Sequence, residues 1–178
     1  GVYLDQKLVF SLPGQAIVHL IPLAASERFT YLARNGDQYT LGVNLAADEP
    51  SPRIRTYGEQ VYHAVMVIEG VVYKKVYRVR GGQIEDLLPT SRTADGLVQN
   101  DQQIVFYHVS IVRREEGLDP SYGMTLHLVS LASGPVRHLP SLVFNAQPTL
   151  RFVWFSQDLI QYTLEDGRVE TVLVDQFE

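Results

Sequence analysis

Apolar and polar residues alternate along most of the chain in short runs that turn-forming residues separate. The stretch QQIVFYHVSIVRREEGLDPSYGMTLHLVSLASGPVRHLP, residues 102–140, is typical: two apolar runs flank a polar interval, and a Gly-Pro turn leads to a shorter run. Alternation with a period of two predicts β-strands. No segment sustains the spacing of an amphipathic helix, and the best exception is one turn near residues 94–99. We therefore predict an all-β protein.

Turn signals divide the chain into about thirteen short strands. The dipeptides Asn35-Gly36 and Glu69-Gly70 each separate two apolar runs, and such pairs favour tight β-hairpins. Successive hairpins predict an antiparallel meander, which is the pattern of a propeller, a barrel or a sandwich. The length of 178 residues fits a single all-β domain, residues 1–178.

An apolar strand, a small or acidic turn and a shorter strand recur along the chain. DQQIVFYHVS followed by TLHLVSLASGPVRHLP shows this unit, and so does VWFSQDLIQYTLEDGRVETVLV. Both resemble the blades of TolB-type β-propellers. The resemblance covers residues 102–140 and 150–174 and implies propeller-like repeats. A closed β-barrel or a β-sandwich built from the same meander is the alternative fold.

Composition and charge narrow the classes of function. The formal net charge of −5 disfavours nucleic-acid binding, because neutralising phosphates requires a basic face. The absence of cysteine excludes disulfides, thiolate catalysis and cysteine-ligated zinc. No apolar run approaches the ~20 residues that span a bilayer, so we predict no transmembrane segment. Gly1 stands directly before an apolar strand without an initiator Met, which suggests a removed leader and an exported or cell-envelope protein.

Three histidines are expected to point inward from their strands: His19, His63 and His108. A set of three histidines can bind zinc, but no close pair enforces that geometry here. We therefore expect histidines that bond to the backbone, and we predict no metal and no cofactor. His127 is expected on the side of its strand opposite to its two leucine neighbours.

Catalytic motifs are missing from the chain. There is no Gly-x-Ser-x-Gly elbow and no glycine-rich phosphate loop, and we predict no catalytic residue. The two polar intervals, residues 90–102 and 113–123, are better candidates because binding residues concentrate on loops that a rigid scaffold holds. The candidate binding residues at the second interval are Arg113, Arg114, Glu115, Glu116, Asp119 and Tyr122.

A second candidate set is basic. Arg53 and Arg55 share one strand face, and Lys74, Arg78 and Arg80 share a face two strands later. If these strands are neighbours, the five cations form a stripe for an anionic partner or a lipid headgroup. Lys75 lies among apolar residues, where we expect its stem to pack while its ammonium reaches water.

The leading hypothesis is a non-catalytic β-domain that binds a protein or cell-envelope partner through its loops and a sheet edge. Exposed edge strands also allow homo-oligomers. The second hypothesis is a small-molecule-binding β-barrel, or an enzyme of that form, whose cavity is lined by inward Tyr, His and Trp side chains.

Overall fold

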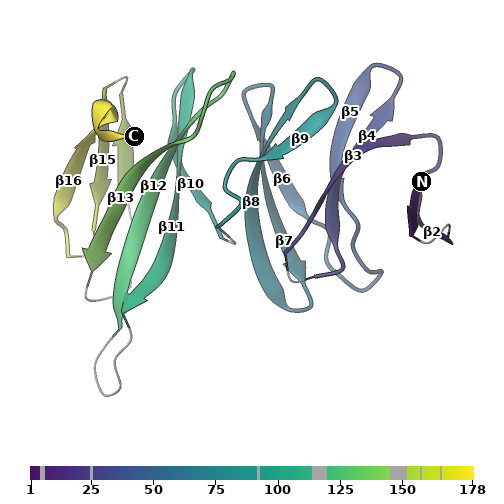
Figure 1. Cartoon of the computed structure of the whole chain (residues 1–178). Helices are drawn as coiled ribbons and strands as arrows, with labels where there is room; N and C mark the ends of the chain where they lie inside the picture. Colours follow the sequence, from purple (N-terminus) through teal and green to yellow (C-terminus); the bar gives the residue numbers. More distant parts are fainter. Residues whose placement is uncertain are drawn as a thin grey trace. The chain divides into compact units, whose positions relative to one another are not determined.

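The computed structural model consists of antiparallel β-strands and one short 3-10 turn in the part of the chain that it describes (Figure 1). That part comprises residues 1–4, 7–24, 26–91, 93–113, 120–144, 152–156, 158–164 and 166–178. The all-β prediction is confirmed. The helical turn expected near residues 94–99 is wrong, because Asp95–Gln99 pairs in register with its neighbouring strand.

The strands follow one another along the chain with short connections. They are β1 (Val2–Leu4), β2 (Lys7–Phe10), β3 (Ala16–Pro22), β4 (Phe29–Asn35), β5 (Gln38–Val43), β6 (Arg53–Tyr57), β7 (Val61–Ile68), β8 (Val71–Arg80), β9 (Gln83–Asp86), β10 (Asp95–Gln99), β11 (Gln103–Arg113), β12 (Ser121–Ser130), β13 (Arg137–Phe144), β14 (Phe152–Phe155), β15 (Leu159–Thr163) and β16 (Val169–Leu173). The 3-10 turn η1 covers Val174–Gln176.

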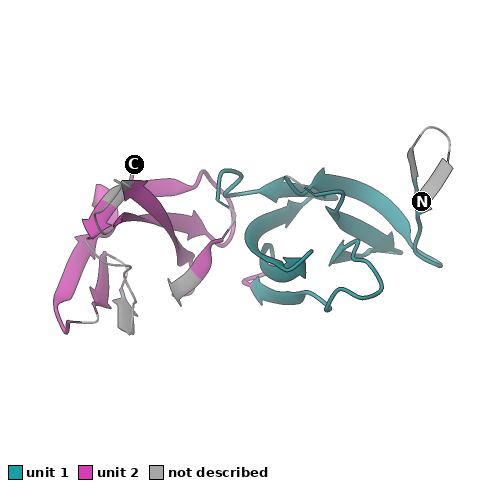
Figure 2. Ribbon diagram, turned by 90° about the horizontal axis from the view of Figure 1, so that it is seen from below, with its two compact units in different colours: residues 1–56, 60–92 teal, residues 57–59, 93–178 magenta. Residues whose placement is uncertain are grey.

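Two compact units divide the chain (Figure 2). Unit 1 contains residues 1–56 and 60–92, and unit 2 contains residues 57–59 and 93–178. The expectation of a single domain stays a prediction.

Every sheet is a meander, because hydrogen-bonded neighbours are consecutive along the chain. Unit 1 holds the sheets β1-β2, β3-β4-β5 and β6-β7-β8-β9, and unit 2 holds β10-β11-β12-β13 and β14-β15-β16. No sheet closes on itself within the described ranges, so the closed-barrel alternative is not supported.

Both predicted hairpins form. Glu69 and Gly70 make a two-residue turn between β7 and β8, with φ angles of 51° and 77°. These left-handed angles match the twist of the flanking strands, and Glu69 is the one described non-glycine residue that adopts such an angle. Between β4 and β5 the turn is shifted by one residue, because Asn35 pairs with Gln38 and Gly36 occupies the first turn position.

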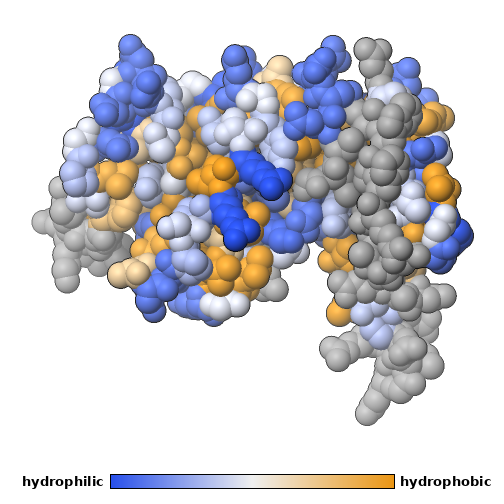
Figure 3. All heavy atoms as spheres, turned by 180° about the vertical axis from the view of Figure 1, so that it is seen from behind, coloured by the Kyte–Doolittle hydropathy of each residue, from blue (hydrophilic) through white to orange (hydrophobic). Residues whose placement is uncertain are grey.

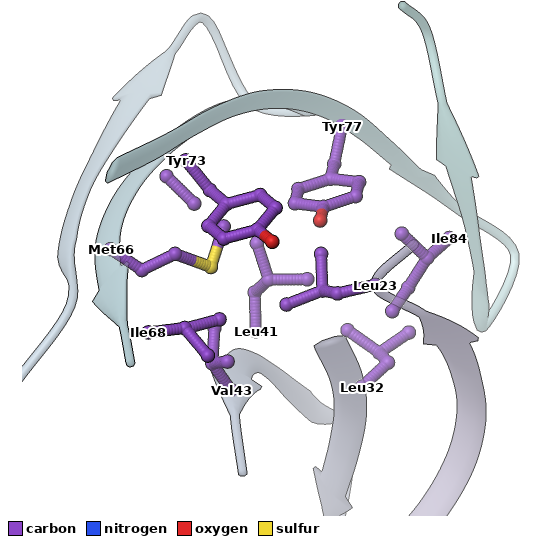
Figure 4. Close-up of a cluster of buried hydrophobic side chains, with 10 residues drawn as sticks. Leu23, Leu32, Leu41, Val43, Met66, Ile68, Tyr73, Tyr77 and Ile84 are labelled. Carbon is purple, nitrogen blue, oxygen red and sulfur yellow. The ribbon is translucent and has the colours of Figure 1, made fainter. Parts of the chain in front are cut away.

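The core of unit 1 lies between its two larger sheets. Side chains of β7 and β8, among them Met66 and Tyr77, point toward Leu32 of β4 and Leu41 of β5 (Figure 4). The cluster contains Leu23, Leu32, Leu41, Val43, Ala64, Met66, Ile68, Tyr73, Tyr77 and Ile84. All ten are buried, which fits the strand alternation that the sequence shows.

Two buried polar side chains of unit 1, Tyr77 and Lys75, have partners within the unit. The Tyr77 hydroxyl lies 2.8 Å from Oγ1 of Thr30, and burial raises the pKa of Tyr77. Lys75 places its Nζ 2.7 Å from Oδ2 of Asp86 and donates to the carbonyl oxygens of Leu88 and Ser91. The expectation that the Lys75 ammonium reaches water is wrong, because a carboxylate and two carbonyls satisfy its three donors inside the protein.

The core of unit 2 lies on one face of β11, β12 and β13 and on β15, β16 and η1. It contains Val105, Met124, Leu126, Leu128, Ile160, Tyr162, Leu164, Val172 and Phe177. The strand β12 is buried on both faces along Leu126–Val129. After η1 the chain returns to β13, where the backbone of Glu178 exchanges two hydrogen bonds with that of His138.

Large apolar side chains are also present on the surface. Among the residues whose side chains the structure describes, ten large apolar ones are exposed by more than a third, including Val143, Val169 and Leu173. On the face drawn in Figure 3, hydrophilic and hydrophobic residues are intermixed. Single apolar residues are ordinary on protein surfaces and do not by themselves indicate a binding site.

Candidate functional site

Three histidines of unit 2 lie side by side on adjacent strands. His108 is on β11, His127 on β12 and His138 on β13. His127 pairs directly with His138 across the ladder, while His108 pairs with Thr125, two residues before His127. Residues two apart share a strand face, so the antiparallel register brings all three imidazoles to the face opposite the core.

The three rings are joined by two hydrogen bonds. Nδ1 of His108 lies 2.8 Å from Nε2 of His127, and Nδ1 of His127 lies 2.7 Å from Nδ1 of His138. The first two rings are stacked with centroids 5.0 Å apart, and the second two meet edge to face at 4.9 Å. We call these residues the histidine row. Its central ring uses both of its nitrogens within the row.

Burial varies along the histidine row. His127 is buried, with 5% of its surface exposed, whereas His108 is half-buried and His138 is exposed. Burial and the neighbouring imidazoles His108 and His138 lower the pKa of His127 to about 3. Burial and the charge of His138 also lower the pKa of His108. The central ring is therefore neutral at ordinary pH, and His138 is the most exposed ring of the row.

The sequence did not reveal the histidine row. The predicted inward set His19, His63 and His108 does not form a cluster: Nδ1 of His19 accepts a hydrogen bond from the backbone N–H of Ile84 at 2.9 Å, within unit 1. The expectation for His127, on the face opposite to its leucine neighbours, is confirmed, although that face is buried there as well. A signal was present, since three strands of one meander each carry a histidine, but their register is a tertiary property.

Most of the predicted loop residues fall outside the described part of the chain. Arg114, Glu115, Glu116 and Asp119 lie outside the described residues, and so does the side chain of Arg113. The strand β11 extends to Arg113, and β12 begins at Ser121. Tyr122 is therefore a strand residue, paired with Ile111 and Phe144.

The predicted basic set shares one face of its sheet, but β7 lies between β6 and β8, so the two strands are not the neighbours that the predicted stripe requires. Ile54 packs against the core of unit 1, so Arg53 and Arg55 point to the opposite face. Tyr73 and Tyr77 are core residues, so Lys74, Arg78 and Arg80 point away from the core as well.

The members of the basic set differ in exposure. Arg53, Arg55 and Arg80 are exposed, and Lys74 is half-buried. Arg78 is buried and lies 3.4 Å from a carboxylate oxygen of Glu85, its partner across the ladder. Three of the five cations, Arg53, Arg55 and Arg80, are therefore accessible to a partner. Arg78 is not, because it is buried beside Glu85.

A third feature is the outer edge of β16. This strand ends its sheet, with β15 as its neighbour on the inner side. At both ends of this pair the even-numbered residues face β15: Leu164 donates to the carbonyl of Arg168, and Val174 donates to that of Asp158. Hydrogen-bonded positions alternate in an antiparallel pair, so the backbone groups of Val169, Thr171 and Leu173 point to the outer edge.

The side chains of this edge form an exposed row. Val169, Thr171 and Leu173 share the outward face of β16, and the first and last are 57% and 46% exposed. The N–H of Leu173 donates to the side-chain oxygen of Gln176 at 2.9 Å, while no such cap is recorded for Val169 or Thr171 in the described part of the chain. We call these three residues the β16 edge.

None of these three features is a metal centre. Among the described residues, no group of three or more His, Asp or Glu side chains is arranged to hold a metal ion. In the histidine row the nitrogens bond to one another along a line, so they do not converge on a common point. The described residues also contain no helix with the length and apolar character needed to cross a membrane.

Comparison of the chain with protein-family models, with curated proteins and with solved structures gives no significant match. The function is therefore argued from the geometry of these features.

Proposed function

We propose that the protein is a non-catalytic β-domain that binds an extended segment of a protein partner along the β16 edge. The observation that carries this proposal is the alternation on β16, which turns the backbone groups of Val169 and Thr171 outward on a strand that ends its sheet. An incoming strand can pair with such groups and extend the sheet. Unpaired edges attract strands in this way unless charge, proline or a covering element blocks them.

The outward side chains of the β16 edge determine which partner sequences it prefers. A strand that pairs with β16 places alternate side chains beside Val169, Thr171 and Leu173, which favours apolar or β-branched residues at those positions. Acidic groups flank the edge, since Glu170 lies within β16 and Asp175 follows in η1. We therefore expect a partner segment in which apolar residues alternate with polar ones and lysine or arginine is present.

A proline substitution tests the β16 edge. Thr171→Pro removes the outward N–H and crowds the edge, and it breaks no bond to β15 because this N–H does not face β15. The probe is a fluorescent ten-residue peptide of alternating valine and lysine, followed by anisotropy. We expect Thr171→Pro to weaken binding at least tenfold and the control Thr171→Val, which keeps the N–H, to bind like the native chain.

Amide hydrogen exchange locates the contact. Peptide binding should slow exchange at Val169 and Thr171, whose amides face the outer edge, and leave Glu170 and Val172 unchanged because β15 already protects them. Equal binding by Thr171→Pro, or protection at residues outside β16, would refute the site. Protection that appears without peptide and rises with protein concentration would identify a second copy of the chain as the occupant.

The loop between β11 and β12 is the second part of this proposal. Arg113 pairs with Ser121, so replacing residues 114–120 by Asn-Gly retains the two strands with a two-residue turn. We expect the thermal midpoint to change by less than about 2 °C while capture of a protein partner falls. Unchanged capture would restrict the binding site to β16.

Propeller-like repetition is part of the same proposal. Two sheets contain four strands in chain order, β6 to β9 and β10 to β13, which is the composition of one propeller blade. This order supports the likeness between residues 102–140 and TolB-type blades.

A further inference from the structure

We propose that the histidine row is one proton-binding site, which takes up a single proton while its hydrogen bonds are intact and loses a bond when it takes up a second. This inference concerns the face of unit 2 opposite its core and does not depend on strand binding at β16. It follows from the two bonds between His108, His127 and His138, and from the way in which the central ring uses both of its nitrogens.

The neutral row allows two proton arrangements. A neutral imidazole carries one N–H and one acceptor nitrogen, so His127 donates one bond of the row and accepts the other. In the first arrangement His138 donates from Nδ1 to His127, and His127 donates from Nε2 to His108. In the second, every bond is reversed. Each arrangement leaves one outer Nε2 with a free lone pair: that of His138 in the first and that of His108 in the second.

A first proton enters at the free outer nitrogen without disturbing the row. In the first arrangement it binds Nε2 of His138, whose ring is exposed, and both hydrogen bonds remain. Transfer of a proton along each bond then moves the charge to His108, and loss of the proton from Nε2 of His108 yields the second arrangement. The row therefore connects β13 with β11 as a short proton path.

A second proton has no such position. Once both nitrogens of His138 carry hydrogen, the remaining acceptors are Nδ1 of His127 and Nδ1 of His108, and each already accepts a bond of the row. A proton on either one places two N–H groups against each other and breaks that bond. The buried position of His127 adds to the cost of a charge there.

The charged groups around the histidine row do not offset a second charge. The charges that lower the pKa of His108 and His127 are those of the other imidazoles. Arg137, next to His138, directs its guanidinium to the carbonyl of Val174, and Asp95 on β10 stands opposite Tyr107 on the other face of the sheet. Thr125 on β12 and Ser110 on β11 are uncharged neighbours on this face, and Glu178 meets His138 through its backbone.

Nitrogen-15 NMR of the imidazole rings counts the protons directly. The full-length chain is titrated from pH 8 to pH 5, and each ring nitrogen is assigned from its long-range couplings. We expect the row to take up one proton in this range, with the shifts of His138 and His108 moving together and His127 keeping one N–H. His19 and His63, the two histidines of unit 1, serve as internal references.

Substitution of the central ring separates the outer two. His127→Gln removes the shared ring, so His108 and His138 should titrate independently and take up two protons over the same range. His63→Gln is the matched control and should leave the count at one. Far-ultraviolet circular dichroism of both variants shows whether the fold is kept.

Two outcomes overturn the proposal. One is uptake of two or three protons by the native row above pH 5 with both hydrogen bonds still present. The other is a single-proton count that persists in a folded His127→Gln variant. If that variant does not fold, His138→Gln provides a second test: His108 and His127 remain bonded, so this pair should still take up one proton, at Nε2 of His108, and a count lower than that of the native chain would overturn the proposal.

Discussion

Units 1 and 2 contain similar sheets but satisfy their interior polar groups in different ways. In unit 1 the ammonium of Lys75 meets a carboxylate and two carbonyl oxygens, so the direction of each bond is fixed. In unit 2 the buried His127 meets two groups of its own kind, and each bond can run in either direction. The first arrangement fixes a charge, whereas the second holds a mobile proton. Similar meanders can therefore enclose either a fixed charge or a group of side chains that exchanges protons.

Removal of the buried cation should have the largest effect. Lys75→Met leaves Asp86 without its ammonium partner and the carbonyls of Leu88 and Ser91 without that donor, and loss of one partner of a buried pair costs about 3–5 kcal/mol. Urea unfolding followed by hydrogen exchange in peptides of unit 1 measures this loss, since two units need not unfold together.

Two further variants show whether the ion pair between Lys75 and Asp86 causes this loss of stability. Lys74→Met, a neighbour on the opposite strand face, should cost less than about 1 kcal/mol. The double variant Lys75→Met with Asp86→Leu should regain part of the lost stability, because both charges are gone. A double variant as unstable as Lys75→Met alone would show that the bonds to the two carbonyls, not the ion pair, hold this region.

Mild acid should act on unit 2 next. The pKa of His127 is about 3 in the folded chain and ordinarily 6.5, so the unfolded chain binds the proton first. The contribution of neutral His127 to the free energy of unfolding of unit 2 is fully present above pH 6.5 and is lost as the pH decreases toward 3. From pH 7 to pH 5 we expect His127 to contribute a loss of at most about 2 kcal/mol, since one pKa unit corresponds to about 1.4 kcal/mol.

The same hydrogen-exchange measurement at pH 7 and pH 5 tests this expectation, after correction for the intrinsic exchange rate. Unit 1 is the internal comparison. In His127→Gln the pH dependence of unit 2 should become weaker. A loss of the same size in units 1 and 2 would argue against the histidine row as its origin.

A neutral bond inside unit 1 should give the smallest effect. Thr30→Val removes the hydroxyl that lies 2.8 Å from that of Tyr77, at a cost of about 1–2 kcal/mol for the buried phenol left behind. The double variant Thr30→Val with Tyr77→Phe should be closer to the native stability, because neither polar group remains. Thermal unfolding of the single and double variants gives the coupling between the two residues.

Strand-level features followed from local sequence. Alternation showed which residues of a strand share a face, and the turn dipeptides located the hairpins, because both signals depend on neighbouring residues. The inward direction predicted for His63 and His108 is wrong with respect to the two cores, which contain Ala64 and Met66 of β7 and Val105 of β11. The helical turn near residues 94–99 was wrong because pairing with β11 decides the conformation of β10. The surroundings of Lys75 were also missed, since Asp86 and Ser91 approach it through the sheet and the loop that follows β9.

By itself, the sequence determined the all-β class, the meander order and which residues of a strand share a face, since these depend on a period of two and on turn chemistry. The tertiary structure alone decided which strands end their sheets and which residues meet across them. The β16 edge exists because β16 has a single neighbouring strand, and the histidine row exists because the β11-β12-β13 register aligns three distant residues. Register and sheet order depend on long-range pairing, which no local pattern encodes.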